Sequence, residues 1–202
     1  MATAAKKSGG GLRFGGWFDR YKTGFANGRN MGDKVRKKIL AWDVAPKDDY
    51  FQELFRVSRN QIIWGGNYFS LPPARCFVVW DKTIPENFSM SMCEYAWTSI
   101  DGNAKMFRKP PNGPANGEKR IHACQKPVSL YTWLLKKFAK PGDKILDTHV
   151  GSASSLVACH KAGLEYWGFE IDPVYYEAAK KRLDRERAQV SLYDLDLTSA
   201  SR

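Results

Sequence analysis

The segment Lys144-Ile-Leu-Asp-Thr-His-Val-Gly-Ser-Ala-Ser-Ser155, followed by Tyr166-Trp-Gly-Phe-Glu-Ile-Asp172, decides the fold class of this chain. Its pattern predicts a strand, a glycine turn and a helix start, and then a second strand that ends in acids. We expect Ile145 and Leu146 to be buried strand residues, and Gly151 to let the backbone approach a ligand. The whole pattern is typical of a nucleoside-cofactor pocket in an α/β fold.

The strand end and the glycine turn also predict the kind of cofactor. Glu170, at the tip of the second strand, is positioned to bind ribose hydroxyls. The dinucleotide fingerprint requires three glycines, whereas this turn offers only Gly151. The sequence therefore disfavours a pyrophosphate and favours a cofactor without phosphates. A helix over residues 156–162 is expected to be capped by nearby serines, namely Ser152, Ser154 and Ser155.

Two motifs in these segments resemble the S-adenosylmethionine half of DNA amino-methyltransferases, especially the phage-type adenine methyltransferases. They are Asp-x-x-x-Gly-Ser-x-Ser-Ser from Asp147, and Gly-Phe-Glu-Ile-Asp-Pro-x-Tyr-Tyr-x-x-Ala-x-x-Arg-Leu from Gly168. Further segments resemble the permuted class of this family, in which the catalytic half precedes the cofactor half. These segments are 60–69, 77–82 and 125–131, and they stand in the order that the family has.

The resemblance implies a Rossmann-like α/β methyltransferase sheet with helices on both faces. It implies S-adenosylmethionine as the cofactor, and methyl transfer to the N6 amine of adenine in double-stranded DNA, as in restriction-modification. The residues that it assigns to the cofactor are Asp147, Thr148, His149, Gly151, Ser152, Glu170, Asp172 and Lys126. Asn67 and Tyr68 are assigned to a substrate pocket, because a flipped adenine needs a stacking surface; the alternative is a structural turn.

One feature of the family does not occur in this sequence. The Asp/Asn-Pro-Pro-aromatic loop that handles the target amine is absent, so no catalytic residue is assigned. Asp172-Pro-Val-Tyr-Tyr176 lacks the second proline and begins a helix, and Leu71-Pro-Pro-Ala74 lacks the acid and the aromatic residue. The central strand that precedes this loop is also not evident, which predicts an incomplete sheet. Three remedies stay open: direct pairing of the flanking strands, a strand from a second chain, or a divergent N-terminal arm.

The charge of the chain indicates a polyanionic partner. The 202 residues carry a net charge of +11, and residues 1–41 hold ten Lys or Arg against two acids. Such clusters bind phosphates by releasing counterions. We expect a basic flexible arm at 1–38 and a methyltransferase-like domain at 39–202, with a basic Pro/Gly/Asn-rich loop inserted at 101–126. The DNA contacts expected in that insert are Lys105, Arg108, Lys109, Lys119 and Arg120; a solvated arm and an ordinary surface loop are the alternatives.

The cysteines, the histidines and the lengths of the apolar runs show whether a metal site or a membrane span is to be expected. The four cysteines form no C-x-x-C pair and the histidines do not stand at ligand spacing, so we expect free thiols and no metal. No apolar run reaches the ~18 residues of a membrane span. We therefore expect a soluble protein of the cytoplasm.

The remaining pattern predicts helices at 50–57, 129–138 and 172–187, and strands at 61–64, 76–80 and 94–99. The first two strands have the continuous apolar character of buried parallel strands. Three functions are compatible with the sequence. They are an active DNA adenine methyltransferase with a divergent or externally supplied loop, a non-catalytic homologue or partner subunit, and a basic nucleic-acid-binding α/β protein.

Overall fold

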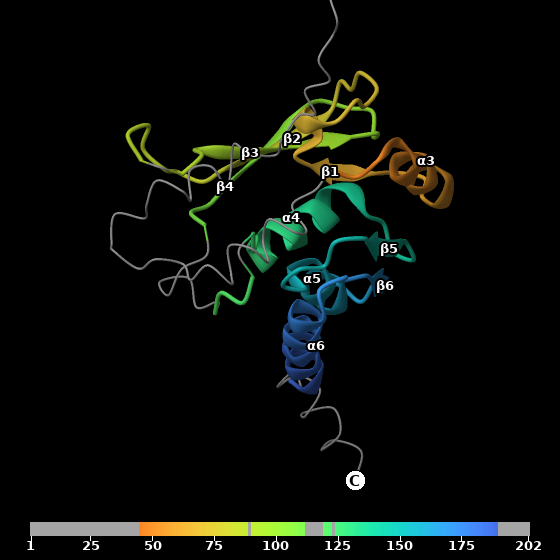
Figure 1. Ribbon diagram of the computed structural model, residues 1–202, viewed down its shortest axis with the longest axis vertical. Coiled ribbons are helices and arrows are strands. Elements are labelled where there is room, and N and C mark those ends of the chain that lie inside the picture. Colours follow the sequence, from red (N-terminus) through yellow and green to blue (C-terminus); the bar gives the residue numbers. More distant parts are fainter. Residues whose placement is uncertain (1–44, 89, 112–118, 123, 190–202) are drawn as a thin grey trace, which may run out of the picture. The chain divides into compact units, whose positions relative to one another are not determined.

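The computed structural model describes residues 45–88, 90–111, 119–122 and 124–189, and the predicted arm at 1–38 lies outside them. The chain divides into two compact units, one with residues up to 79 and 85–105, the other with 80–84 and 106 onward. Figure 1 labels the helices and strands of both. The predicted helices are present, with ends shifted by one or two residues, and they alternate with strands in the second unit. The α/β class is confirmed.

The first unit packs one helix on aromatic residues of its strands and turns. Helix α3 (Asp48–Val57) buries Phe51, whose ring centroid lies 4.8 Å from that of Phe69. On the same helix, Phe55 meets Trp97 edge to face at 5.9 Å. Aromatic pairs of this kind stabilise beyond their buried area. The expected packing of this helix against the sheet is confirmed.

The larger sheet has the order β1-β3-β2-β4. Its strands are β1 (Ile62–Trp64), β2 (Phe77–Asp81), β3 (Cys93–Thr98) and β4 (Lys105–Arg108). The expectation of a parallel β1 is wrong, because β1 pairs antiparallel with β3, with Ile62 opposite Thr98 and Trp64 opposite Ala96. All three β1 residues are only partly buried, as suits an edge strand rather than a core strand.

The expectation of a loop throughout 101–126 is also wrong, because residues 105–108 of this segment form strand β4. The strand and the residue after it contact aromatic side chains. The Phe107 ring packs 5.5 Å from Trp133, and the Trp80 indole N–H donates to the Lys109 carbonyl at 2.8 Å.

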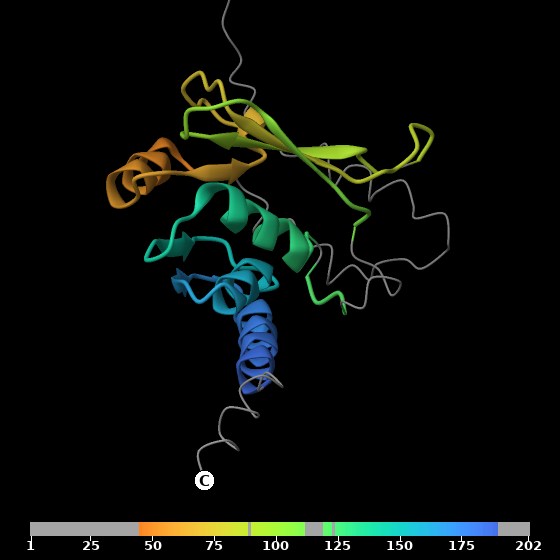
Figure 2. The same cartoon turned by 180° about the vertical axis from the view of Figure 1, so that it is seen from behind.

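The second unit is built around one short helix whose first six residues are buried. Its elements are α4 (Val128–Phe138), β5 (Lys144–Asp147), α5 (Ser154–Lys161), β6 (Glu165–Gly168) and α6 (Pro173–Ala188). Helix α5 contacts α4, α6 and both strands, as both views show (Figures 1 and 2). Leu156 and Val157 of α5 form a core with Ala179 and Leu183 of α6. The turns at both ends of α5 are therefore held in place by packing.

Strands β5 and β6 form a parallel pair, with Leu146 opposite Trp167. Tyr166 faces the core of this unit, so the alternation of strand side chains places Leu146 and Trp167 on the other face. There they are 37% and 46% exposed, and the expected burial of Leu146 is wrong. Among the described residues β5 pairs with β6 alone, so neither β1 nor any other strand fills the predicted central position.

Candidate functional site

The candidate cofactor site lies where β5 and β6 end. Beyond the strands the two chain segments stay hydrogen bonded, because the Phe169 N–H donates to the Asp147 carbonyl and the Val150 N–H to the Phe169 carbonyl, at 2.9 and 3.0 Å. Gly168 allows this approach, since a Cβ there would lie 2.4 Å from the Val150 side chain. The carboxyl ends of both strands therefore form one continuous edge, as expected for a ligand site in an open α/β sheet.

Glu170 joins the two segments. Its Oε2 accepts from the Gly151 N–H at 2.8 Å, and its Oε1 accepts from the Asp172 N–H at 2.9 Å. A carboxylate oxygen can accept two hydrogen bonds, so each oxygen keeps one further position. A ribose diol supplies two O–H donors, which fits these positions. Beside Glu170, Ile171 is 91% exposed and offers an apolar surface to a nucleobase.

Asp147 organises the turn that follows β5. Its Oδ1 accepts from the His149 N–H at 2.9 Å, and its Oδ2 accepts from the Ser155 hydroxyl. Thr148 Oγ1 lies 3.0 Å from His149 Nδ1, so these two predicted cofactor residues contact each other. The sequence pattern placed Asp147, Thr148 and His149 in this turn, but the bond from Ser155 was not anticipated.

The serines do not cap α5, so that expectation is wrong. The N-cap is Ala153, which has a left-handed φ of 60°, and no side chain caps the helix. Because the chain enters α5 through this conformation, the hydroxyls turn away from the first N–H groups. Ser152 and Ser154 instead meet at 3.0 Å, and Arg182 of α6 donates to the Ser152 carbonyl and to the Ser154 hydroxyl at 2.9 and 3.0 Å. Arg182 therefore belongs to the candidate site, and the sequence did not indicate it because the serines and Arg182 lie far apart in the chain.

The group that approaches Gly151 is a side chain of the protein. A Cβ at Gly151 would lie 3.3 Å from the His122 imidazole, and the φ of Gly151 is left-handed at 54°. The same imidazole meets the Tyr175 ring at 4.3 Å. Burial lowers the pKa of His122, and the neighbouring charge of Lys126 lowers it further, while Glu170 acts in the opposite direction. The charge of Lys126, a predicted cofactor residue, therefore acts on this ring.

Asp172 begins α6. Its Oδ1 accepts from the N–H groups of Val174 and Tyr175 at 2.8 and 3.3 Å, and its side chain is buried. This is an N-cap with proline at the first helical position. The likeness of Asp172–Tyr176 to a catalytic loop therefore has a structural explanation, as the sequence indicated.

The predicted substrate residues Asn67 and Tyr68 lie in the first unit, on the short 3-10 helix η2 (Gly66–Tyr68). Both side chains are exposed. A Cβ at Gly66 would lie 2.4 Å from Trp97 Cβ, so this glycine serves the close packing of η2 on β3. The residue that comes close to Gly66 is therefore Trp97 of β3.

Three of the five predicted DNA-contacting residues donate a side-chain hydrogen bond within the chain. Arg108 Nε donates to Asp81 Oδ2 at 2.8 Å, and Lys109 Nζ donates to Ser129 Oγ at 2.9 Å. Arg120 Nε donates to a backbone carbonyl at 3.3 Å. Hydrogen bonds from Thr83 and Arg108 lower the pKa of Asp81. The other two residues are Lys105, in β4, and Lys119, which is exposed.

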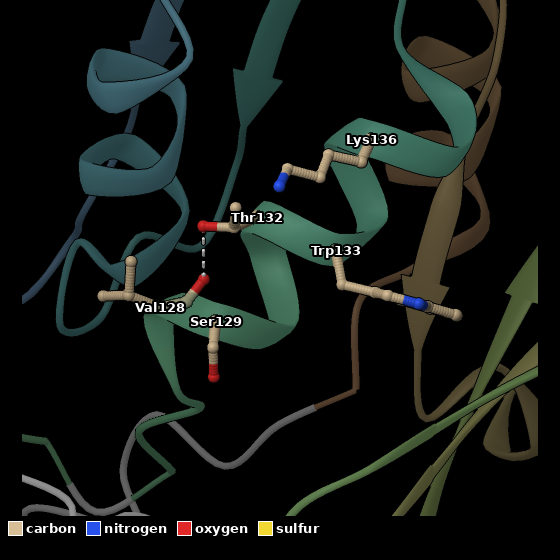
Figure 3. Close-up of a pocket in the computed structure, with 5 residues that line it drawn as sticks. All are labelled: Val128, Ser129, Thr132, Trp133 and Lys136. Atoms are coloured by element: carbon tan, nitrogen blue, oxygen red, sulfur yellow. Dashed lines mark hydrogen bonds between the residues drawn. The ribbon is translucent and has the colours of Figure 1, made fainter.

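A shallow groove lies along α4 (Figure 3), lined by Val128, Ser129, Thr132, Trp133 and Lys136. The Thr132 hydroxyl donates to the Val128 carbonyl at 3.1 Å, so it is satisfied within the helix. No residue predicted for the cofactor lines this groove. Among the described residues, no group of three or more metal-ligating side chains is present, and no helix is long and apolar enough to cross a membrane.

Comparisons with known proteins agree with this geometry. A family model described as DNA methylase, of the N6/N4 methyltransferase type, matches residues 26–181. The chain is 35% identical over 71 residues to the Type II methyltransferase M.HpaI of Haemophilus parainfluenzae; the match covers 35% of this chain and only 23% of that protein. The solved structure of the M1.HpyAVI-SAM complex is similar in fold, with a TM-score of 0.50 and 20% identity, over 75% of this chain and 95% of that one. The chain therefore belongs to the N6/N4 DNA methylase family.

Proposed function

We propose that this chain binds S-adenosylmethionine at the ends of β5 and β6 and forms the cofactor half of a DNA adenine-N6 methyltransferase. The observation that carries the proposal is the bridging Glu170, which holds the Gly151 turn and keeps acceptor positions for a ribose diol. The turn also lacks the glycines that a pyrophosphate requires. A nucleoside cofactor without phosphates therefore fits this edge.

The side chains around the turn have distinct roles in this proposal. Glu170 accepts from the ribose, and the exposed Ile171 supports the adenine ring. The residues that surround the methionine and sulfonium end are Asp147, Thr148, His149, Gly151, Ser152 and Lys126. Bound S-adenosylmethionine supplies an electrophilic methyl group to the exocyclic amine of the base.

The proposal that this chain acts on DNA is supported by its basic residues and by its membership of the N6/N4 DNA methylase family. Asn67 and Tyr68 offer an amide and an exposed ring on which an unstacked adenine can be held. The basic residues of β4 and of the segment after it contact phosphates, which positions the duplex without reading its sequence. Adenine is proposed over cytosine because the motifs resemble those of adenine enzymes.

Methyl transfer requires an acceptor that orients the target amine, and this sequence has no acid-Pro-Pro-aromatic loop. Among the described residues β5 pairs on one side only. We propose that a second chain supplies both the strand and the loop. The isolated chain is then expected to bind the cofactor while transferring methyl groups very slowly or not at all.

Calorimetric titration tests cofactor binding. Glu170→Gln should weaken binding of S-adenosylmethionine at least tenfold, since hydrogen bonds to a charged acceptor contribute about 1.5–3 kcal/mol each. The matched control is Glu165→Gln, at the opposite end of β6, which should bind as the wild type does. Equal binding by all three proteins would refute the assignment of Glu170.

A second assay separates the functions. Radiolabelled methyl transfer to unmodified genomic DNA, followed by nucleoside analysis, distinguishes N6-methyladenine from N4-methylcytosine. Cofactor binding without transfer supports the partner-subunit form of the proposal. Salt-sensitive DNA binding without cofactor binding would leave only a basic nucleic-acid-binding protein. Robust methylation by the chain alone would show that a residue described here as structural carries the acceptor role.

A further inference from the structure

The imidazole of His122 lies directly beside the position that a side chain at Gly151 would take. An added Cβ at Gly151 would lie 3.3 Å from Nδ1 and 3.4 Å from Cε1 of this ring. On another side the ring meets Tyr175, in the first turn of α6, at 4.3 Å. His122 therefore contacts the turn after β5 and the helix after β6, which are the two segments that Glu170 joins.

The tautomer of neutral His122 is set by its hydrogen bonding. The Cys124 N–H donates to His122 Nδ1 at 3.1 Å, so Nδ1 is an acceptor and a neutral ring carries its proton on Nε2. A second proton would occupy Nδ1 and oppose this donor. Burial lowers the pKa of His122, so the neutral form predominates near neutral pH.

The charged groups that face the ring come from several segments, and they are Glu170, Asp172, Lys126 and Arg120. Protonation of His122 acts on Glu170 in particular. A cationic imidazole attracts this carboxylate, which in the neutral state accepts from the Gly151 N–H at 2.8 Å. Protonation therefore acts on both contacts that hold the turn, the ring against Gly151 and the carboxylate on its N–H.

We propose that neutral His122 is a positioning residue for the Gly151 turn, and that protonation of His122 releases the turn and weakens binding of S-adenosylmethionine. This inference rests on the proposed function. The sign follows from linkage: the cofactor-binding form carries one proton fewer at His122, so affinity falls as the pH falls. For one proton the dissociation constant rises by at most about tenfold per pH unit.

The test is calorimetric titration of S-adenosylmethionine between about pH 7.5 and about pH 5, a range that reaches lower than the ordinary histidine pKa because burial lowers the pKa of His122. The decisive variant is His122→Asn, because its Oδ1 can accept the Cys124 N–H while the side chain does not titrate. We expect wild-type affinity to fall with pH, and His122→Asn to bind equally at both ends of the range. His160→Gln, in the last turn of α5, is the matched control and should keep the pH dependence. Circular dichroism at each pH verifies that every protein is folded.

A double-mutant cycle tests the contact itself. Gly151→Ala carries the strain of a left-handed backbone in any background. With His122 present, the added methyl group must also push the ring back by a few tenths of an ångström. Gly151→Ala should therefore lose more cofactor affinity in the wild type than in a His122→Ala background. Equal fold-losses in the two backgrounds would show that the ring does not position the turn.

The outcomes distinguish the two proposals. A wild-type chain that binds no S-adenosylmethionine at any pH overturns the proposed function and this inference with it. Binding whose pH dependence persists in His122→Asn overturns the inference alone. Loss of the dependence in His149→Gln, with its retention in His122→Asn, would assign the switch to the exposed histidine of the same turn.

Discussion

Replacing Glu170 by alanine should destabilise the free protein, before any cofactor is added. The carboxylate accepts two backbone N–H groups, from Gly151 and Asp172, and Gly151 is buried, so water cannot easily replace this partner. Taking about 1.5 kcal/mol for each bond to an ionised acceptor, the free energy of unfolding falls by about 3 kcal/mol. For a chain of this length, that is a shift of about 6–12 °C in the melting midpoint.

The control is Glu165→Ala, which removes the glutamate at the start of β6. Glu165 pairs with Lys144 at 3.2 Å, but both side chains are more than half exposed, so the pair contributes at most about 1 kcal/mol. Thermal and urea unfolding of both variants, followed by circular dichroism, measure the difference. Equal midpoints for the two variants would refute the idea that Glu170 ties the strand ends together.

Other consequences can be measured directly. Gly168→Ala places a methyl group 2.4 Å from a Val150 carbon and should cost about 1–3 kcal/mol of unfolding free energy, measured in urea; an unchanged midpoint would contradict the close approach. DNA affinity should fall steeply with salt, and removal of residues 1–38 should flatten that dependence; an unchanged slope would leave the arm as a solvated tail. Burial raises the pKa of the Cys159 thiol to about 12, so an unfolded thiol ionises first and the free energy of unfolding should fall as the pH rises above about 9. In native protein, a thiol reagent should modify two cysteines quickly and two slowly, in the order of their exposure: Cys93 and Cys124 before Cys76 and Cys159.

The sequence predicted what depends on local pattern. Apolar runs ending in Asp147 and before Glu170 identified the two strands, and Asp172 followed by proline identified a helix start. What it could not predict depends on contacts between distant residues. Nothing near Gly151 indicates that the imidazole of His122 fills the space beside it.

Two further differences have the same origin. The serines lost their capping role because Ala153 adopts a left-handed conformation, which is set by packing and not by propensity. Leu146 was expected to be buried and is exposed. The expectation was wrong because a strand pattern does not specify which neighbours cover each side chain. The family resemblance suggested residues for the candidate site, but it did not predict the bonds that Ser155 and Arg182 donate around the turn.

Lys144 protects the uncovered face of the small sheet. Its ammonium lies 5.7 Å from the centroid of the Trp167 ring, on the side where the indole is exposed. An exposed apolar face of a sheet invites non-specific association with other proteins. A lysine on such a face discourages that association, because another molecule could cover the indole only by desolvating the ammonium. Lys144 thereby acts as a gatekeeper, and neutralising it by acetylation would remove that protection.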